Sequence, residues 1–173
     1  PRGRISILTR LSAFLSVALL VNCQCDENLE SLPEPEIVLL NEDGLAHDEA
    51  DPWLIIAFGD VDSGQSATQT LTIKNRGSGT LTLENLCLVS TTDYEEATST
   101  APCVQMTSTD YVFSNIVGTE LRSDEEVELD ISFSPQVGGD SNMFLRVDSN
   151  DEKSPIVAVQ LTARGTAGRL CAD

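Results

Sequence analysis

Cysteine and histidine, the side chains best suited to bind metal ions or act as nucleophiles, are few in this chain and widely spaced. The cysteines stand at positions 23, 25, 87, 103 and 171, and the single histidine is His47. Zinc sites take their ligands from closely spaced Cys and His pairs, and this chain has no C-x-x-C pair and no Cys/His cluster. We therefore predict neither a zinc site nor any other cofactor.

The other polar residues do not form the pattern of a catalytic site either. A Ser-His-Asp arrangement would need His47, which lies in a strongly acidic stretch. A glycosidase needs two carboxylates held in a cleft, whereas the acids here fall in turns and on the outward positions of predicted strands, where water solvates them. No glycine-rich phosphate loop or metalloprotease motif is present, so we predict that the protein is not an enzyme.

One turn has enough oxygen-bearing side chains to suggest calcium. Asp148, Asn150 and Asp151 lie close together, with Glu152 next, and Ca²⁺ prefers carboxylate and amide oxygens. Asp and Asn are also common in tight turns that bind no metal. We prefer the turn interpretation and keep a calcium site at these residues as the weaker hypothesis.

Residues 1–22 have the pattern of an export signal. Arg2, Arg4 and Arg10 make a positive flank, and an apolar core runs from Leu11 to Val21. A helix that spans a bilayer needs about 20 apolar residues, so this run is too short to cross and fits a signal peptide instead.

The end of this run, Leu20-Val21-Asn22-Cys23, resembles the lipobox of bacterial lipoproteins. The resemblance implies cleavage before Cys23, a diacylglycerol on its thiol, and stable membrane attachment through the acyl chains. Asn22 stands where Gly, Ala or Ser is usual, so an ordinary secretory signal with an incidental cysteine is the alternative. Gln24 favours the outer membrane or cell surface as the destination, with the periplasm as the alternative.

The chain is strongly acidic, with 28 Asp and Glu against 10 Lys and Arg and a net charge of −18. Such a charge repels phosphate backbones, so we predict no nucleic-acid partner. Residues 26–51 contain many acids and no Lys or Arg. This composition predicts that residues 23–51 form an acidic tether, interrupted near residues 37–40 by a short strand that lies at the edge of the following domain.

Residues 52–166 alternate between short β-prone runs and turn signals. In Ala67–Lys74, Leu71 and Ile73 are predicted to face inward, and Glu126–Phe133 alternates in the same way. Regular alternation of this kind predicts an all-β, antiparallel sandwich of about seven strands, with a small barrel as the structural alternative.

The less regular runs give more specific expectations. Leu145 and Val147 are predicted to face inward with Arg146 outward, and Tyr111–Val117 is predicted to be one strand. A turn at Gly59-Asp60 is predicted to end a strand over Leu54–Phe58, and the segment Asn75–Gly79 is predicted to be another turn. No stretch has the periodicity of a helix of ordinary length.

Several of these motifs occur together in a known family. Phe58–Ala67 (FGDVDSGQSA), Thr70–Leu83 (TLTIKNRGSGTLTL), Ile131–Pro135 and Leu161–Gly165 stand in the order found there. Over about residues 53–166 the chain resembles the ASPM/SPD-2/Hydin-type modules, also described in bacteria as choice-of-anchor-D or Hydin-like domains. The resemblance implies a seven-stranded immunoglobulin-like sandwich, from which the long stretch Ser90–Asp110 departs.

Cys87 and Cys103 flank a loop rich in Ser and Thr. In an exported protein they are the natural disulfide pair, and closing a loop of this size stabilises a fold by about 3 kcal/mol in the chain-entropy model. Two buried thiols are the alternative. Cys171 is expected to pair with Cys25 or with a downstream region, and residues 167–173 read as the start of a linker.

Together these features predict a non-enzymatic lipoprotein of the cell envelope that carries an immunoglobulin-like structural or adhesion module. Its expected partners are the membrane, through the lipid anchor, and a protein of unknown identity. One alternative is a periplasmic binding or assembly subunit. The other is a spacer domain within a larger surface enzyme.

Overall fold

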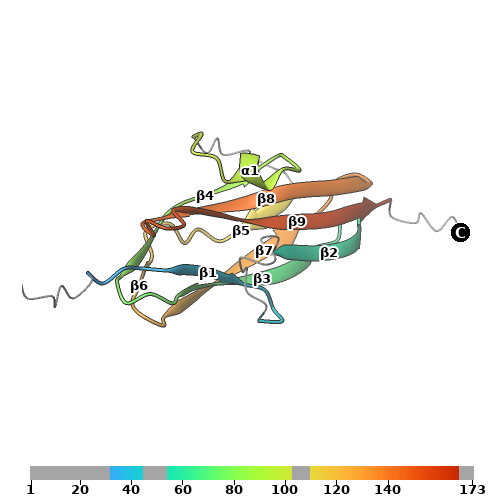
Figure 1. Cartoon of the computed structure of the whole chain (residues 1–173). Coiled ribbons are helices and arrows are strands. Elements are labelled where there is room, and N and C mark those ends of the chain that lie inside the picture. The colour runs from blue at the N-terminus through green and yellow to red at the C-terminus, as the bar shows by residue number, and fades with distance from the viewer. Residues whose placement is uncertain (1–31, 45–53, 103–109, 168–173) are drawn as a thin grey trace, which may run out of the picture. The chain divides into compact units, whose positions relative to one another are not determined.

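The computed structural model describes residues 32–44, 54–102 and 110–167, which belong to one compact unit starting at Ser31. Within these residues nine strands form two sheets packed face to face (Figure 1). The four-stranded sheet has the order β1 (Ile37–Leu40), β3 (Ala67–Asn75), β7 (Glu126–Phe133), β5 (Tyr111–Phe113). The five-stranded sheet has the order β2 (Ile55–Asp62), β9 (Ile156–Thr166), β8 (Gly139–Ser149), β4 (Leu81–Val89), β6 (Glu120–Leu121). The predicted all-β sandwich is confirmed.

The core lies between the sheets and follows the predicted alternation. Leu71 and Ile73 of β3 are fully buried, and they pair in register with Leu129 and Val127 of β7. Across the core the five-stranded sheet contributes a second apolar layer: Leu83, Leu145, Val147, Val159 and Leu161. Because each strand buries every second side chain, the threonines of β3 stay partly exposed, as the sequence predicted.

Two expectations about strand pairing need correction. Most pairs are antiparallel, but β2 runs parallel to β9, from Ile55 opposite Gln160 to Asp62 opposite Thr166. The predicted turn at Gly59-Asp60 is wrong, because β2 continues through Gly59 with a register shift after Ala57. Gly59 has a φ of 69°, a conformation that glycine adopts without strain, so it introduces an irregularity into the strand instead of ending it.

The stretch predicted as one strand over Tyr111–Val117 divides between the two sheets. β5 has only three residues, and after a turn at Gly118 the chain crosses to pair β6 with β4. The strand predicted near residues 37–40 is confirmed at the edge of the four-stranded sheet, where Ile37 lies opposite Asn75. The sandwich therefore includes residues upstream of the predicted domain start at residue 52.

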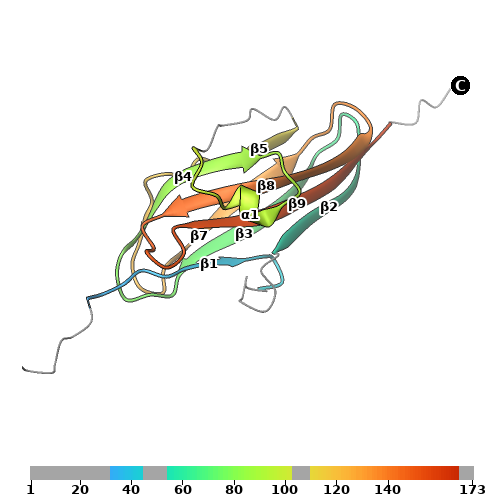
Figure 2. The same ribbon diagram turned by 45° about the horizontal axis from the view of Figure 1, so that its top comes forward.

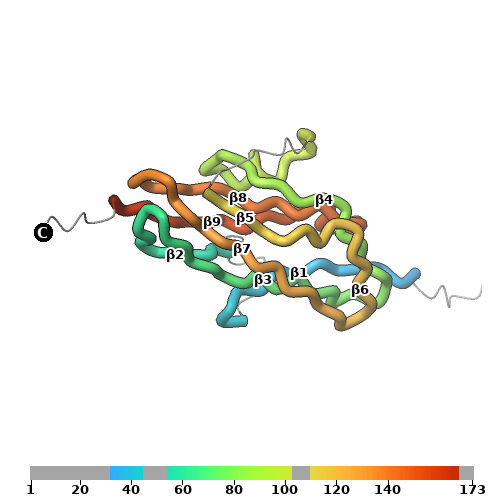
Figure 3. Tube along the Cα trace, turned by 180° about the vertical axis from the view of Figure 1, so that it is seen from behind, coloured from blue at the N-terminus to red at the C-terminus, as the bar shows by residue number. Residues whose placement is uncertain are grey.

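The chain enters and leaves this sandwich at opposite ends (Figures 1 and 2). The N-terminal end holds the start of β1, the turn Asn75–Gly79 and the turn between β8 and β9. The C-terminal end holds the turn after β2 and the last residues of β9, where Ser63 N–H donates to Thr166 O at 2.8 Å. The tube in Figure 3 shows the same separation from behind.

Candidate functional site

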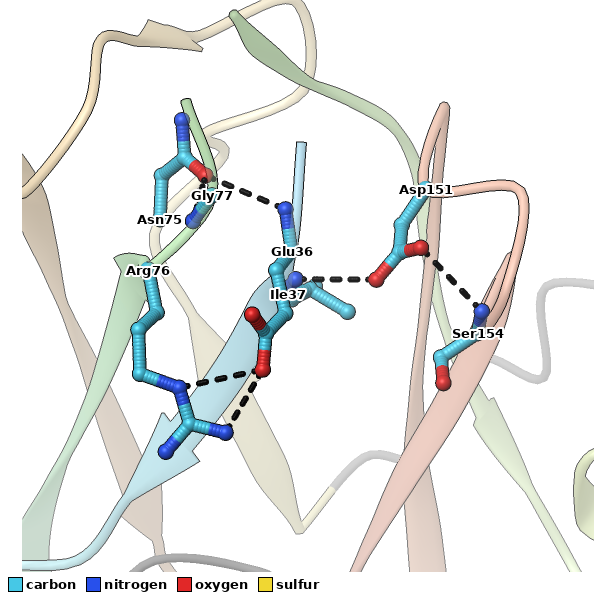
Figure 4. Close-up of polar contacts among 7 residues, drawn as sticks. All are labelled: Glu36, Ile37, Asn75, Arg76, Gly77, Asp151 and Ser154. Atoms are coloured by element: carbon cyan, nitrogen blue, oxygen red, sulfur yellow. Dashed lines mark hydrogen bonds and ion pairs between the residues drawn. The ribbon is translucent and has the colours of Figure 1, made fainter. Parts of the chain in front are cut away.

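Two of the buried polar side chains, Asn75 and Asp151, lie close together at the N-terminal end of the sandwich. We call their surroundings the N-terminal clasp, which comprises Glu34–Ile37, the turn Asn75–Gly79 and the turn residues Asp151–Ser154. Figure 4 draws the part of the clasp around Glu36, Asn75 and Asp151. Asn75 is fully buried, and its amide nitrogen donates to Gly79 O at 2.7 Å and to Leu121 O at 2.9 Å. Its Oδ1 accepts from Glu36 N–H at 3.2 Å and Gly77 N–H at 2.9 Å. One side chain thus holds the turn and the incoming chain together.

Asp151 makes the second connection of the clasp. It is 1% exposed, and its Oδ2 accepts from Ile37 N–H at 3.0 Å. Its Oδ1 accepts from Lys153 N–H at 2.9 Å and Ser154 N–H at 3.2 Å. A buried carboxylate is tolerated when charge-assisted hydrogen bonds replace its water. Asp151 therefore ties the first strand of one sheet to the β8–β9 turn of the other.

Backbone bonds and exposed ion pairs complete the clasp. Arg76 N–H donates to Glu36 O, and Gly79 N–H donates to Glu34 O, each at 2.9 Å. The Arg76 guanidinium contacts the Glu36 carboxylate at 2.6 Å, and Lys153 Nζ lies 2.8 Å from Glu34 Oε2. The Glu34 carboxylate raises the pKa of the Lys153 ammonium. These side chains are solvated, so their pairing adds little stability.

Close backbone packing explains the glycine at position 79 in this turn. A Cβ built on Gly79 would lie 2.5 Å from Pro33 O, nearer than nonbonded atoms approach. The sequence Asn75-Arg-Gly-Ser-Gly79 was predicted only as a turn. The structure adds that this turn is the surface on which the incoming chain packs.

The three residues of the calcium hypothesis make separate polar contacts. Asp148 is bound to Arg146, with Arg146 Nε 2.5 Å from Asp148 Oδ1. Asn150 accepts from Thr82 N–H at 2.7 Å and donates to Thr80 O at 3.0 Å. Asp151 accepts the backbone N–H bonds of the clasp, from Ile37, Lys153 and Ser154. No group of three Cys, His, Asp or Glu side chains within residues 32–44, 54–102 and 110–167 is placed to hold a metal ion.

A second polar centre lies on the outer face of the five-stranded sheet. It is covered by the segment that follows β4, residues 90–102, which we call the cap. The prediction that Arg146 faces solvent is wrong, because it is only 6% exposed. Its Nη1 donates to Ser99 O at 2.7 Å and to Ala101 O at 2.9 Å, so the segment after β4 covers it. Strand alternation correctly turns Arg146 away from the main core, but the described segment after β4, which includes Ser99 and Ala101, folds over that face.

The cap is built on the short helix α1 (Tyr94–Ala97), which the sequence did not predict. Asp93 caps its N-terminus by accepting from Glu95 N–H at 2.9 Å. Ala97, Phe144 and Ala158 form a small apolar cluster beneath it, against which the Tyr94 ring packs edge-on with centroids 6.0 Å apart. Burial raises the pKa of the Tyr94 phenol, although a hydrogen bond with the Ala158 backbone opposes the shift.

Cys87 lies beside this cap, in register with Arg146, and it is buried and disulfide-bonded. Its predicted partner Cys103 lies outside the described residues, so the Cys87–Cys103 pairing stays a prediction. The predicted lipid-attachment residue Cys23 also lies outside them, as do Cys25, His47 and Cys171. No helix among the residues that the structure describes is long and apolar enough to cross a membrane.

Comparison of the sequence with protein-family models and with curated proteins gives no match. Among solved structures, the chain is similar to the ASH/PapD-like domain 7 of human CEP192, with a TM-score of 0.53 and 16% identity over 98% of this chain and 100% of that one. It is also similar to a protein of unknown function from Porphyromonas gingivalis W83, with a TM-score of 0.52 and 14% identity over 79% of this chain. It spans about half of that protein, 51% of its length. The first of these likenesses shows the fold alone: the chain has an immunoglobulin-like, PapD-like β-sandwich similar to that of an ASH domain.

Proposed function

We propose that this protein is a non-enzymatic lipoprotein of the cell envelope, attached to the membrane through Cys23, whose sandwich is a structural or adhesion module. Its location is the outer membrane or the cell surface, and its partner beyond the membrane is another protein. The proposal joins the lipobox-like end of the export signal to the geometry of the folded part.

The observation that carries the proposal is the separation of the two ends of the sandwich. β1 begins at the end where the described chain enters, and β9 leads the chain away to the opposite end (Figure 1). β9 has 11 residues, and at about 3.3 Å per residue it spans roughly 35 Å. In the proposed protein the membrane anchor precedes the N-terminal end of the sandwich along the chain. The C-terminal end and the side surfaces of the sandwich are then held away from the membrane.

The mass of the mature protein tests the anchor. We expect the membrane-extracted full-length protein to begin at Cys23 and to carry added acyl mass, and we expect the Cys23→Ala variant to lack that mass. Cys25→Ala is the matched control, and it should keep the acylated mass. A mature chain cut elsewhere and free of lipid would contradict the proposal and leave a secreted sandwich.

One observation favours the second candidate, a periplasmic binding or assembly subunit. β5 is an edge strand, paired only with β7 among the described strands, and its Val112 side chain is 64% exposed. An open edge can accept a strand from a partner. If it does, Val112→Asp should abolish co-purification of a defined envelope protein, while Val137→Asp, at another exposed valine, should leave it unchanged. Equal recovery with both variants would remove this candidate.

A further inference from the structure

The first and last strands of the sandwich both run along the line that joins its two ends. β1 and β9 each point from the N-terminal end toward the C-terminal end, and β2 runs parallel to β9 (Figures 1 and 2). Tension applied at Leu32 and Ala167 therefore pulls β1 and β9 along their own axes, in opposite directions. The hydrogen bonds of a ladder lie across the strands, so this tension loads many of them together instead of opening them one at a time.

β9 is held strongly against such sliding. It pairs on one side with β2, through the register from Ile55–Gln160 to Asp62–Thr166. On the other side it pairs with β8 along almost its whole length, from Gly139–Gly165 to Asp148–Ile156. For β9 to slide out of the C-terminal end, both ladders must break.

β1 is the weaker attachment, because it has only four residues and, among the described strands, pairs with β3 alone. The N-terminal clasp adds bonds at the point where tension arrives. Glu36 N–H is held by Asn75, Ile37 N–H by Asp151, and Glu36 O by Arg76 N–H. The Asp151 bond also passes load from β1 to the β8–β9 turn, and so to the other sheet.

We propose that the sandwich is a tension-bearing link and that the N-terminal clasp is the element that limits its strength. Asp151 is the positioning residue that joins β1 to the β8–β9 hairpin under load. The inference rests on the proposed function only for the source of the tension, which is the pull between a membrane anchor and a bound partner. The mechanical property belongs to the fold and can be measured without either.

Pulling the full chain in two directions tests the proposal. Azide-bearing residues at the exposed positions Leu32 and Ala167 would carry DNA handles for optical tweezers, and a second protein would carry them at Gln65 and Ala167. The second pair lies at one end of the sandwich, so it peels β9 from β2 bond by bond. We expect the Leu32–Ala167 direction to need a several-fold higher unfolding force at the same loading rate. Equal forces would overturn the proposal.

The Asp151→Asn variant distinguishes a mechanical role of the clasp from a contribution to the overall stability of the fold. Asparagine keeps one oxygen for Lys153 and Ser154 N–H but turns an NH₂ group toward Ile37 N–H, so only the connection to β1 is lost. We expect a lower force in the Leu32–Ala167 direction and an unchanged force in the peeling direction. Asp43→Asn, at an exposed carboxylate outside the clasp, is the matched control. A loss of equal proportion in both directions would mean that Asp151 only stabilises the fold, which would overturn its mechanical role. A lipid-free mature chain would contradict the anchor and leave these force measurements standing.

Discussion

Arg146 and Asp151 are the two charged residues with buried side chains in the part of the chain that the structure describes. Each is tolerated inside the protein for the same physical reason, since hydrogen bonds replace the water that it loses. Arg146 donates hydrogen bonds to backbone carbonyl oxygens of the cap, and Asp151 accepts hydrogen bonds from backbone N–H groups of the clasp. Removing either should therefore cost far more than removing a charge at the surface.

Arg146→Ala should lower the free energy of unfolding by about 3–5 kcal/mol, because it leaves Asp148 and two backbone carbonyls without their donor. Arg164→Ala is the control, since Arg164 lies 3.7 Å from Asp140 in a solvated pair and should contribute no more than about 1 kcal/mol. Urea unfolding of both variants measures the difference. Similar losses would mean that the cap does not need the buried guanidinium.

Asp151→Ala should destabilise the protein by about 1–3 kcal/mol even with calcium removed, because three backbone N–H groups lose a charged acceptor. We also expect added calcium to leave the melting temperature of the natural protein unchanged, since these oxygens already accept hydrogen bonds. Thermal melts with calcium and with a chelator measure both effects. A calcium-dependent increase that Asp151→Ala abolishes would favour the calcium hypothesis instead.

Ionisation of the Tyr94 phenol makes the free energy of unfolding depend on pH in the alkaline range. Its folded-state pKa is raised by burial above the ordinary value of 10.0, so the unfolded chain loses the phenol proton first. The contribution of the Tyr94 phenol to the free energy of unfolding is fully present below pH 10.0, and it is lost as the pH rises through the folded-state pKa. Tyr94→Phe should therefore reduce the loss of stability in this range, measured by urea unfolding at several pH values. An identical pH dependence in the variant would contradict this.

At the scale of elements, the clasp depends on how closely two stretches of backbone approach. Gly79→Ala should destabilise the protein by about 1–3 kcal/mol, because the new methyl group would displace the incoming chain at Pro33. Gly138→Ala is a suitable control, since a Cβ there lies 3.4 Å from its nearest neighbour, Gly165 O. Thermal unfolding of the two variants should separate them, and equal melting temperatures would contradict this role of Gly79.

The sequence predicted the elements whose side chains alternate and missed those that depend on a neighbouring segment. Leu71 and Ile73 are buried as expected, because period-2 alternation follows directly from strand geometry. Burial of Arg146 could not be predicted in the same way, since alternation gives the face of a side chain and not what covers that face. The continuation of β2 through Gly59 was missed because a glycine in a strand and a glycine in a turn look alike in sequence.

The candidate site was less predictable than the fold for a related reason. Asn75 and Asp151 were each read as turn residues, and each does lie at a turn. Their shared role arises only when folding brings together segments far apart in sequence, with a separation of 39 for the Glu36–Asn75 bond and of 114 for the Ile37–Asp151 bond. Local pattern carries no information on such a contact, although a polar residue directly after a buried strand run was a usable signal at Asn75.

At the scale of the whole molecule, negative charge is the dominant property. The net charge is −18, and on the outer face of the four-stranded sheet β7 alone presents Glu126, Glu128 and Asp130. Lys74, in register with Glu126, is the basic residue that β3 places on that face. Folding adds Glu42 from another segment to this face, where it accepts from Thr70 N–H while the Thr70 hydroxyl donates to Asp130. Repulsion between acids brought together in this way opposes the compact state.

Salt should therefore stabilise the protein. Raising the ionic strength from 0.01 to 0.15 M shortens the Debye length from about 30 to about 8 Å, which screens repulsion between the acids on this face. We expect the melting temperature to rise with NaCl over this range, and to rise less in Glu128→Gln, which removes the central acid of the row. Glu84→Gln, at an exposed position of β4 in the other sheet, is the matched control for the loss of one charge. A melting temperature that falls with salt would contradict this prediction, because it would mean that the favourable ion pairs of the fold together outweigh the repulsion between its acids.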